Sequence, residues 1–234
     1  MTVTCRNLTK KYGAYSAVNN INLTLGSGRI IGLLGPNGSG KTTLIKMING
    51  LLTPSSGELL IDGRAPGVES KKHISYLPER TYLNMDMRVR GLLRYFADFY
   101  EDFDMERAHS MLDQLGIRAD DRLKTMSKGT KEKVQLILVM SRRAQLYVLD
   151  EPIGGIDPAG RDYILDTILT NFDPGASILL STHLIADIER ILDDVIFLRY
   201  GSVSLYGNAD EIRSQHGKSI DALFREEYRC EENF

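Results

Sequence analysis

The chain has few cysteines, no long apolar run and almost no net charge. Cys5 and Cys230 are its two cysteines, which excludes a disulfide framework, and no CxxC pair indicates a metal site. We expect both thiols to be free, in a reducing compartment. The first residues lack the apolar core of a signal peptide, and no apolar stretch approaches the ~20 residues that span a bilayer. These absences predict a cytoplasmic protein whose membrane role, if any, depends on another polypeptide.

Neither sign of charge dominates the sequence. The 29 basic and 31 acidic side chains leave a net charge of -2, which argues against a nucleic-acid partner bound through bulk charge. Apolar residues make up 42% and charged residues 26% of the chain, as in ordinary soluble globular proteins. Because the sequence has no repeat, low-complexity linker or long charge run, we expect a single domain over residues 1–234.

Short apolar runs alternate with segments of helical period. Strands are predicted at 3–8, 21–25, 30–35, 57–63, 73–78, 145–152, 177–183 and 194–207. The last of these reads as a hairpin that turns at Tyr200-Gly201. A helix is predicted at 42–50, and a mostly helical insert at about 84–142. This order predicts an α/β fold with a mostly parallel sheet, antiparallel strands near both ends and an inserted helical subdomain.

A phosphate-binding loop is the first chemical motif. GPNGSGKTT at 35–43 fits G-x-x-x-x-G-K-[ST] between a predicted strand and a predicted helix. Its glycines let backbone N–H groups converge on phosphate oxygens at the positive end of a helix. We expect Lys41 to reach the β- and γ-phosphates and Thr42 to bind Mg²⁺. The other expected phosphate-binding positions are Gly35, Asn37, Gly38, Ser39, Gly40 and Thr43. The alternative, a chance Gly/Ser turn before a helix, is disfavoured by this context.

Two carboxylates end the apolar strand LYVLDEP at 146–152. Asp150 is the candidate to hold Mg²⁺, directly or through water. Glu151 is the candidate to orient or deprotonate the attacking water. Because adjacent strand residues point to opposite faces, the two side chains need not compete for one site. Taken alone, such a pair is more often turn chemistry, but the phosphate loop favours the catalytic interpretation.

The order and spacing of GPNGSGKTT, TMSKGTKEK (125–133), LYVLDEP, GGIDP (154–158) and LLSTH (179–183) resemble the ATP-binding cassette of ABC transporters. The resemblance covers about residues 1–215 and implies a P-loop NTPase core that binds ATP and Mg²⁺. It implies that Tyr12 stacks on adenine, that Asp157 is the D-loop aspartate and that His183 is the switch histidine contacting the γ-phosphate. The alternatives are a core or surface tyrosine, a plain Asp-Pro turn and a structural histidine.

The chain departs from the family pattern before Asp157, where Gly154-Gly155 replaces the more usual Ser-Ala, and in two further motifs. Glu79 stands where the family usually has the Q-loop glutamine, a contact of Mg²⁺ and of the attacking water. A glutamate could still coordinate Mg²⁺, but it adds a charge. The signature turn, usually Leu-Ser-Gly-Gly-Gln, keeps Ser127 and Gly129 for the γ-phosphate of ATP held by another subunit, but carries Lys128 and Thr130. Lys128 either adds positive charge near the phosphate or points to solvent, and we favour the second interpretation.

The resemblance implies an ATPase subunit on the cytoplasmic face of the cell membrane that drives separate integral membrane subunits. Two cassettes, identical or different, would enclose two ATP molecules. The degenerate signature and the YLPE-type loop favour bacterial ABC-2-type exporters of drugs, antimicrobial peptides or peptide toxins, including those for phenol-soluble modulins. We expect a short tail at 216–234 and no accessory domain. A soluble ABC ATPase without a membrane partner and a regulatory cassette with weak hydrolysis remain as alternatives.

Overall fold

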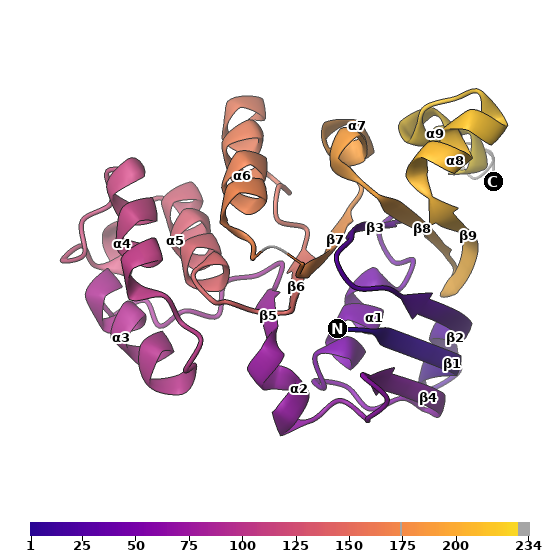
Figure 1. Ribbon diagram of the computed structural model, residues 1–234, viewed down its shortest axis with the longest axis horizontal. Helices are drawn as coiled ribbons and strands as arrows, with labels where there is room; N and C mark the ends of the chain where they lie inside the picture. The colour runs from indigo at the N-terminus through magenta and orange to yellow at the C-terminus, as the bar shows by residue number, and fades with distance from the viewer. Residues whose placement is uncertain (174, 229–234) are drawn as a thin grey trace.

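The computed structural model describes residues 1–173 and 175–228 and contains two β-sheets (Figure 1). The larger sheet has six strands in the order β5-β6-β7-β3-β8-β9. They are β3 (Ile30–Leu34), β5 (Ile74–Leu77), β6 (Leu146–Asp150), β7 (Ser177–Thr182), β8 (Asp194–Arg199) and β9 (Ser202–Asn208). Neighbours from β5 to β8 pair in parallel, and β9 pairs antiparallel with β8. The fold is therefore α/β with a mostly parallel sheet, as predicted.

A smaller antiparallel sheet has the order β2-β1-β4. Its strands are β1 (Val3–Tyr12), β2 (Tyr15–Leu25) and β4 (Ser56–Ile61). The predicted strands at 3–8 and 21–25 were too short, because exposed polar residues interrupt the apolar alternation beyond Leu8 and before Ile21. Register shifts along the β1–β2 pair explain why a strict period of two fails there. The extended β1–β2 hairpin brings Tyr12 and Tyr15 together at its tip.

Helix α1 (Lys41–Ile48) lies between the two sheets. Its apolar residues Leu44, Ile45, Met47 and Ile48 are buried in one core with residues of both sheets. Alternation along β7 separates two cores: Leu179 enters the core with α1, whereas Ile178 and Leu180 enter the core on the other face. This double coverage explains why β6 and β7 are buried along their whole length. The burial of α1 between the two sheets also fixes the position of its N-terminus, which follows the phosphate loop.

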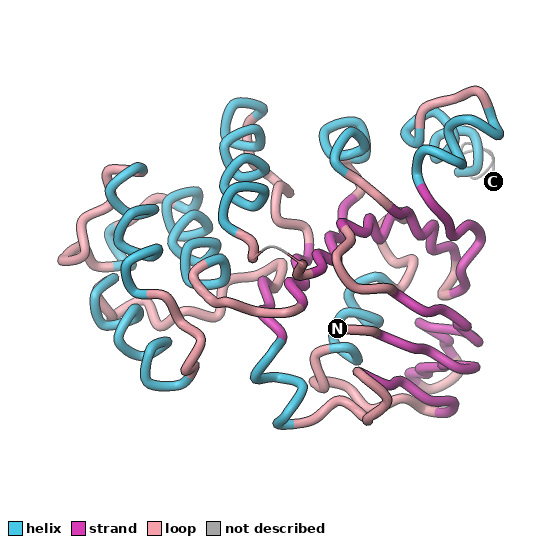
Figure 2. The backbone as a smooth tube through the Cα atoms, in the orientation of Figure 1, coloured by secondary structure: helices cyan, strands magenta, loops and turns pink. Residues whose placement is uncertain are grey.

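The remaining helices cover the other face and the β5 edge of the large sheet (Figures 1 and 2). They are α2 (Val68–His73), α3 (Val89–Phe99), α4 (Met105–Gln114), η1 (Leu123–Thr125), α5 (Lys128–Met140), α6 (Pro158–Asn171), α7 (Ile185–Ile188), η2 (Glu189–Ile191), α8 (Ala209–His216) and α9 (Ile220–Tyr228). In Figure 1, α3, α4 and α5 form a group of helices beside β5. None of the described helices is long and apolar enough to cross a membrane.

Local signals set the start of two helices that carry predicted site residues. Ser127 begins α5: its Oγ accepts a hydrogen bond from the Thr130 N–H at 3.1 Å. Asp157 begins α6 in the same way, because its Oδ1 accepts from the Gly160 N–H at 3.0 Å. Both are ordinary N-caps. The predicted cap at Ser127 and the predicted turn at Tyr200-Gly201 are confirmed, whereas Cys230 lies outside the described residues.

The buried side chain of Arg142 ties the helical group to the start of β5. Its Nε lies 2.9 Å from Asp102 Oδ1, and its guanidinium lies 3.7 Å from the centre of the Tyr100 ring. It also donates a hydrogen bond to the Ile74 carbonyl oxygen. Burying an arginine is tolerated when ion pairs and hydrogen bonds satisfy it. Arg142 thus holds the α3–α5 group against the strand that leads to Glu79.

Candidate nucleotide-binding site

The loop at 35–43 connects β3 to α1 and has a backbone that requires glycine. Gly40 has φ 107°, and a Cβ placed on it would lie 2.2 Å from the Ala17 carbonyl oxygen. Gly38 has φ 81°, in the left-handed region that other residues rarely adopt. The loop therefore curls tightly against β2 and directs its backbone toward the N-terminus of α1, an arrangement suited to phosphate.

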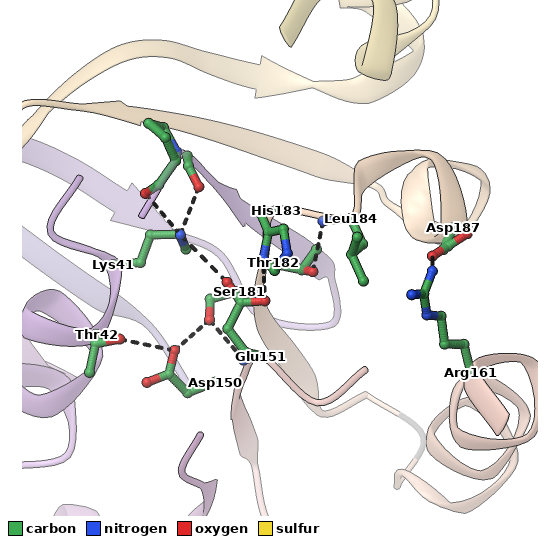
Figure 3. A network of polar contacts seen from close by, with 12 residues as sticks. Lys41, Thr42, Asp150, Glu151, Arg161, Ser181, Thr182, His183, Leu184 and Asp187 are labelled. Carbon is green, nitrogen blue, oxygen red and sulfur yellow. Dashed lines mark hydrogen bonds and ion pairs between the residues drawn. The ribbon is translucent and has the colours of Figure 1, made fainter. Parts of the chain in front are cut away.

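Lys41 belongs to the polar network drawn in Figure 3. Its Nζ donates hydrogen bonds to the carbonyl oxygens of Gly35 at 2.7 Å and Pro36 at 3.2 Å, and lies 3.5 Å from Glu151 Oε1. Burial lowers the pKa of Lys41, and the neighbouring carboxylates, Glu151 foremost, oppose that shift. The lysine is therefore held within reach of the loop by groups that favour its charged form.

Asp150 is buried at the end of β6, beside the first turn of α1. Its Oδ1 accepts hydrogen bonds from Ser181 Oγ at 2.6 Å and Thr42 Oγ1 at 3.4 Å. Its Oδ2 is buried and has no hydrogen-bond partner among the described residues. Burial raises the pKa of Asp150 despite the hydrogen bonds from the two hydroxyls. An unsatisfied carboxylate oxygen close to a threonine hydroxyl fits a divalent cation, whose oxygen ligands include carboxylates.

No group of three or more His, Cys, Asp or Glu side chains within residues 1–173 and 175–228 is arranged to hold a metal ion alone. A magnesium ion binds with few protein ligands where substrate phosphates supply the others. Glu79 follows β5 and lines the same cleft. Its charge favours the protonated form of both Lys41 and Asp150 and so raises the pKa of each, as a minor contribution. The donor set therefore fits Mg²⁺ that arrives with a nucleotide.

Glu151 leaves the strand in a left-handed conformation with φ 51°. Its N–H donates to both the backbone oxygen and the Oγ of Ser181. Its Oε2 lies 3.0 Å from His183 Nδ1. The two carboxylates engage different partners, as expected, but this backbone turn, rather than strand alternation alone, aims Glu151 at the cleft. Left-handed non-glycine residues are costly and occur often at functional sites.

A cleft of about 860 Å³ runs beside the phosphate loop. Many of the predicted site residues line it: Tyr12, Asn37, Gly38, Ser39, Gly40, Lys41, Thr42, Thr43, Glu79, Glu151 and His183. Gly35 and Asp150 lie beneath this lining, bonded to Lys41 and Thr42 respectively. The structure thus gathers around one cavity Tyr12 of β1 and residues that follow the ends of β3, β5, β6 and β7.

Tyr15, which is not among the site residues predicted from the sequence, also lines this cleft. Its hydroxyl donates a hydrogen bond to the Gly38 carbonyl oxygen at 3.0 Å. Tyr12 and Tyr15 are cross-strand partners in the β1–β2 hairpin, so both rings stand near the loop and both are about half exposed. A tyrosine paired with Tyr12 across a short turn was the available signal. Arg80, Thr81 and Lys131, which also line the cleft, carried no comparable signal.

Besides Gly35 and Asp150, three predicted site residues do not line the cleft. Ser127, Gly129 and Asp157 are exposed at the starts of α5 and α6. Lys128 does line it, although 83% of its side chain is exposed and its Nζ lies 3.7 Å from Glu132 Oε1. In the single chain the lysine is therefore exposed and also borders the cleft, and its position relative to phosphate in a second cassette stays a prediction.

The fold and the loop define a P-loop nucleotide-binding protein. Residues 18–154 match the family model described as ABC transporter. The uncharacterized ABC transporter ATP-binding protein YhaQ of Bacillus subtilis is 31% identical over 221 residues, which cover 92% of this chain and 74% of that protein. The SkfA peptide export ATP-binding protein SkfE of the same organism is 30% identical over 229 residues, covering 94% and 96%.

Solved structures agree with these sequence matches. A structure of an ATP binding subunit of an ABC transporter is 31% identical, covers 97% of this chain and 99% of its own, and superposes with a TM-score of 0.86. The chain belongs to the family of ABC transporter ATP-binding subunits. Proteins of this family bind ATP and in general hydrolyse it.

Proposed function

We propose that this chain hydrolyses ATP to power an exporter whose membrane-spanning subunits are separate chains. The observation that carries the proposal is the position of the Glu151 carboxylate, which lies between Lys41 and His183 beside the phosphate loop. A carboxylate at that point can accept a proton from water attacking the γ-phosphate. Tyr12 stacks on adenine, and the backbone of 35–43 holds the phosphates.

Thr42 and Asp150 would hold Mg²⁺, with Glu79 as a further oxygen donor. The bound ion would supply positive charge that offsets the charge of the phosphate oxygens. The buried Asp150 carboxylate is suited to this role, since Ser181 fixes one oxygen and leaves the other unpartnered. Glu79 adds a second negative charge where the family usually has a neutral amide.

The contacts of Lys41 and Glu151 suggest an order of events. Both carboxylate oxygens of Glu151 are engaged, one by Lys41 and one by His183. ATP draws Lys41 to its phosphates, because they carry more negative charge than the carbonyls of Gly35 and Pro36. Oε1 of Glu151 then becomes available to water. The water oxygen bonds to the γ-phosphorus, its proton passes to Glu151, and the bond to ADP breaks.

A second cassette completes the site. Ser127, Gly129 and Asp157 are exposed and lie outside the lining of the chain's own cleft, which leaves them available to a second copy or a related subunit. In that arrangement the N-terminus of α5 faces the γ-phosphate bound by the other cassette. The His183 side chain of the cassette that binds this ATP contacts the same γ-phosphate.

The membrane partner docks on the helical insert at about 84–142 and the loop before it, within the single domain 1–234. Tyr82, Tyr95 and Phe99 expose more than half of their side chains there, and the rings of Tyr95 and Phe99 lie 4.6 Å apart. Exposed aromatic side chains are favoured anchors of protein interfaces. The similarity to SkfE, named for peptide export, supports a peptide among the proposed substrates. Docking on a membrane subunit would place the chain on the cytoplasmic face of the membrane.

Purification from membranes tests this function. The chain should be recovered with an integral membrane subunit, and the complex should hydrolyse ATP in a Mg²⁺-dependent manner. The matched control is Tyr95→Ala/Phe99→Ala, which should lose the membrane subunit but still bind ATP. Recovery of an active ATPase without any membrane subunit would support a soluble ABC ATPase instead. Recovery of a complex that binds ATP without hydrolysing it would support a regulatory cassette.

A further inference from the structure

Arg161 joins the segments that follow β6 and β7. It lies in the first turn of α6, and its Nε donates a hydrogen bond to the Ile156 carbonyl oxygen at 2.8 Å. Its Nη1 lies 2.8 Å from Oδ2 of Asp187 on α7. Figure 3 shows this pair beyond Leu184, on the far side of His183 from the phosphate loop. One guanidinium therefore contacts both segments at once.

These two segments also carry the groups proposed for catalysis. Glu151 ends the β6 side and His183 ends the β7 side, and they meet through the 3.0 Å contact of Oε2 with Nδ1. The segments are thus bridged twice: by Glu151–His183 near the phosphates and by Arg161–Asp187 behind them. The His183 side chain is 45% exposed, so surrounding packing alone does not fix its ring.

The short length of α7 makes the second bridge important. It spans only Ile185–Ile188, and a helix this short has little stability of its own. Ile185 and Ile188 anchor it in the core, while Asp187 supplies its polar link to α6. If that link breaks, α7 and the chain between β7 and α7, which includes His183, lose their ion pair to α6 and are held to the core by the apolar contacts of Leu184, Ile185 and Ile188.

We propose that Arg161 is a positioning residue that, through Asp187, sets the His183 ring against the Glu151 carboxylate. The inference rests on the proposed ATP hydrolysis. Arg161 and Asp187 are 25% and 36% exposed, so solvent screens their attraction, and the ion pair adds little stability. The divergent Nε–H and Nη–H donors fix direction in a way that the single ammonium group of a lysine does not.

The test compares Arg161→Ala, Arg161→Lys and Asp187→Asn in steady-state ATP hydrolysis. We expect Arg161→Ala to lower kcat about 10-fold while KM for ATP stays within about twofold, because misplacing a catalytic group affects the reaction more than binding. Arg161→Lys keeps the charge and should recover only part of kcat. Equal loss in kcat and in ATP affinity, or no loss in either, would overturn the proposal.

The imidazole of His183 gives a readout that does not depend on turnover. The chain has four histidines, so His183→Ala assigns the ring signal in an NMR spectrum. We expect the Nδ1–H signal of His183 to shift or broaden in Arg161→Ala. An unchanged signal would show that Arg161 does not act through His183. The NMR measurement still tests the role of Arg161 if the wild-type protein shows no ATPase activity. That lack of activity would refute the proposed function but not the positioning role of Arg161.

Arg107 supplies a matched control. It is also partly buried, and it donates hydrogen bonds to Met140 O, Asn171 O and Asp173 Oδ1. It lies on α4 and does not line the cleft. Arg107→Ala should lower thermal stability at least as much as Arg161→Ala and leave kcat and the His183 signal unchanged. If both variants changed kcat and the signal equally, general loosening of the fold would explain the result.

Discussion

The Nδ1 atom of His183 lies 3.0 Å from Oε2 of Glu151. An ionised carboxylate accepts but does not donate hydrogen bonds, so this contact is a hydrogen bond in the His183 tautomer that carries a proton on Nδ1. The opposite oxygen of the carboxylate faces Lys41 at 3.5 Å. Glu151 thus lies between two cationic or proton-donating side chains, and each must be considered when its role in hydrolysis is tested.

Glu151→Gln should retain ATP binding and lose turnover. The amide keeps the size of the side chain but does not accept a proton from water, so we expect hydrolysis to fall at least ~100-fold. ATP should then trap a dimer, detectable by size-exclusion chromatography with Mg²⁺ present. A rate near that of the wild type would remove Glu151 from the role of general base.

Tyr15→Phe should weaken nucleotide binding without slowing the chemical step. The change removes the hydroxyl that donates to Gly38 O at 3.0 Å and keeps the ring. A neutral hydrogen bond is worth about 0.5–1.5 kcal/mol, so calorimetry should show Kd for ATP rising roughly 2–10-fold. Tyr206→Phe is the control, because its hydroxyl donates to Thr24 O at 2.8 Å away from the cleft. Equal effects of both variants would contradict a specific role of Tyr15.

Asp150→Asn should stabilise the nucleotide-free protein while abolishing Mg²⁺-dependent hydrolysis. Burial raises the pKa of Asp150, so the folded protein disfavours the ionised form. The contribution of Asp150 to the free energy of unfolding is therefore fully present below the pKa that this group has in the unfolded chain. It is lost as pH rises through the higher pKa of the folded protein. A neutral amide does not suffer that loss. At neutral pH we therefore expect Asp150→Asn to raise the free energy of unfolding by ~1 kcal/mol, which corresponds to an increase of about 2–4 °C in Tm.

The pH dependence of the Asp150→Asn effect provides its own check. The difference in Tm between the variant and the wild type should shrink as pH is lowered through the raised pKa, because both side chains are then neutral. Asp173→Asn is a control of opposite sign, since it breaks the 2.9 Å ion pair with Arg107 and should lower Tm. A lower Tm for Asp150→Asn at neutral pH would contradict the burial argument.

Lys128→Gly should change the ATPase rate by less than about twofold, because an exposed charge is screened by water and salt. The side chain is 83% exposed and reaches Glu132 only at 3.7 Å. The measurement is ATP hydrolysis by the dimer at low and high ionic strength. A large loss at low salt that disappears at high salt would instead place the amine near phosphate in the second cassette.

Much of the site was predictable because its chemistry is local. The phosphate loop depends on glycines and a lysine within one short segment, and its strand–loop–helix context follows from apolar periodicity. The caps at Ser127 and Asp157 involve residues close in sequence. The longer extents of β1 and β2 were missed because exposed polar residues and bulges break the period of two.

By itself, the sequence determined the α/β class, the phosphate loop and the order of motifs, since each depends on neighbouring residues and backbone conformation. The tertiary structure decided which distant side chains meet. It placed Tyr15 on Gly38, turned Glu151 between Lys41 and His183, and joined Arg161 to Asp187. Those contacts depend on strand order and on the left-handed turn at Glu151, and a pattern along a single chain does not specify either.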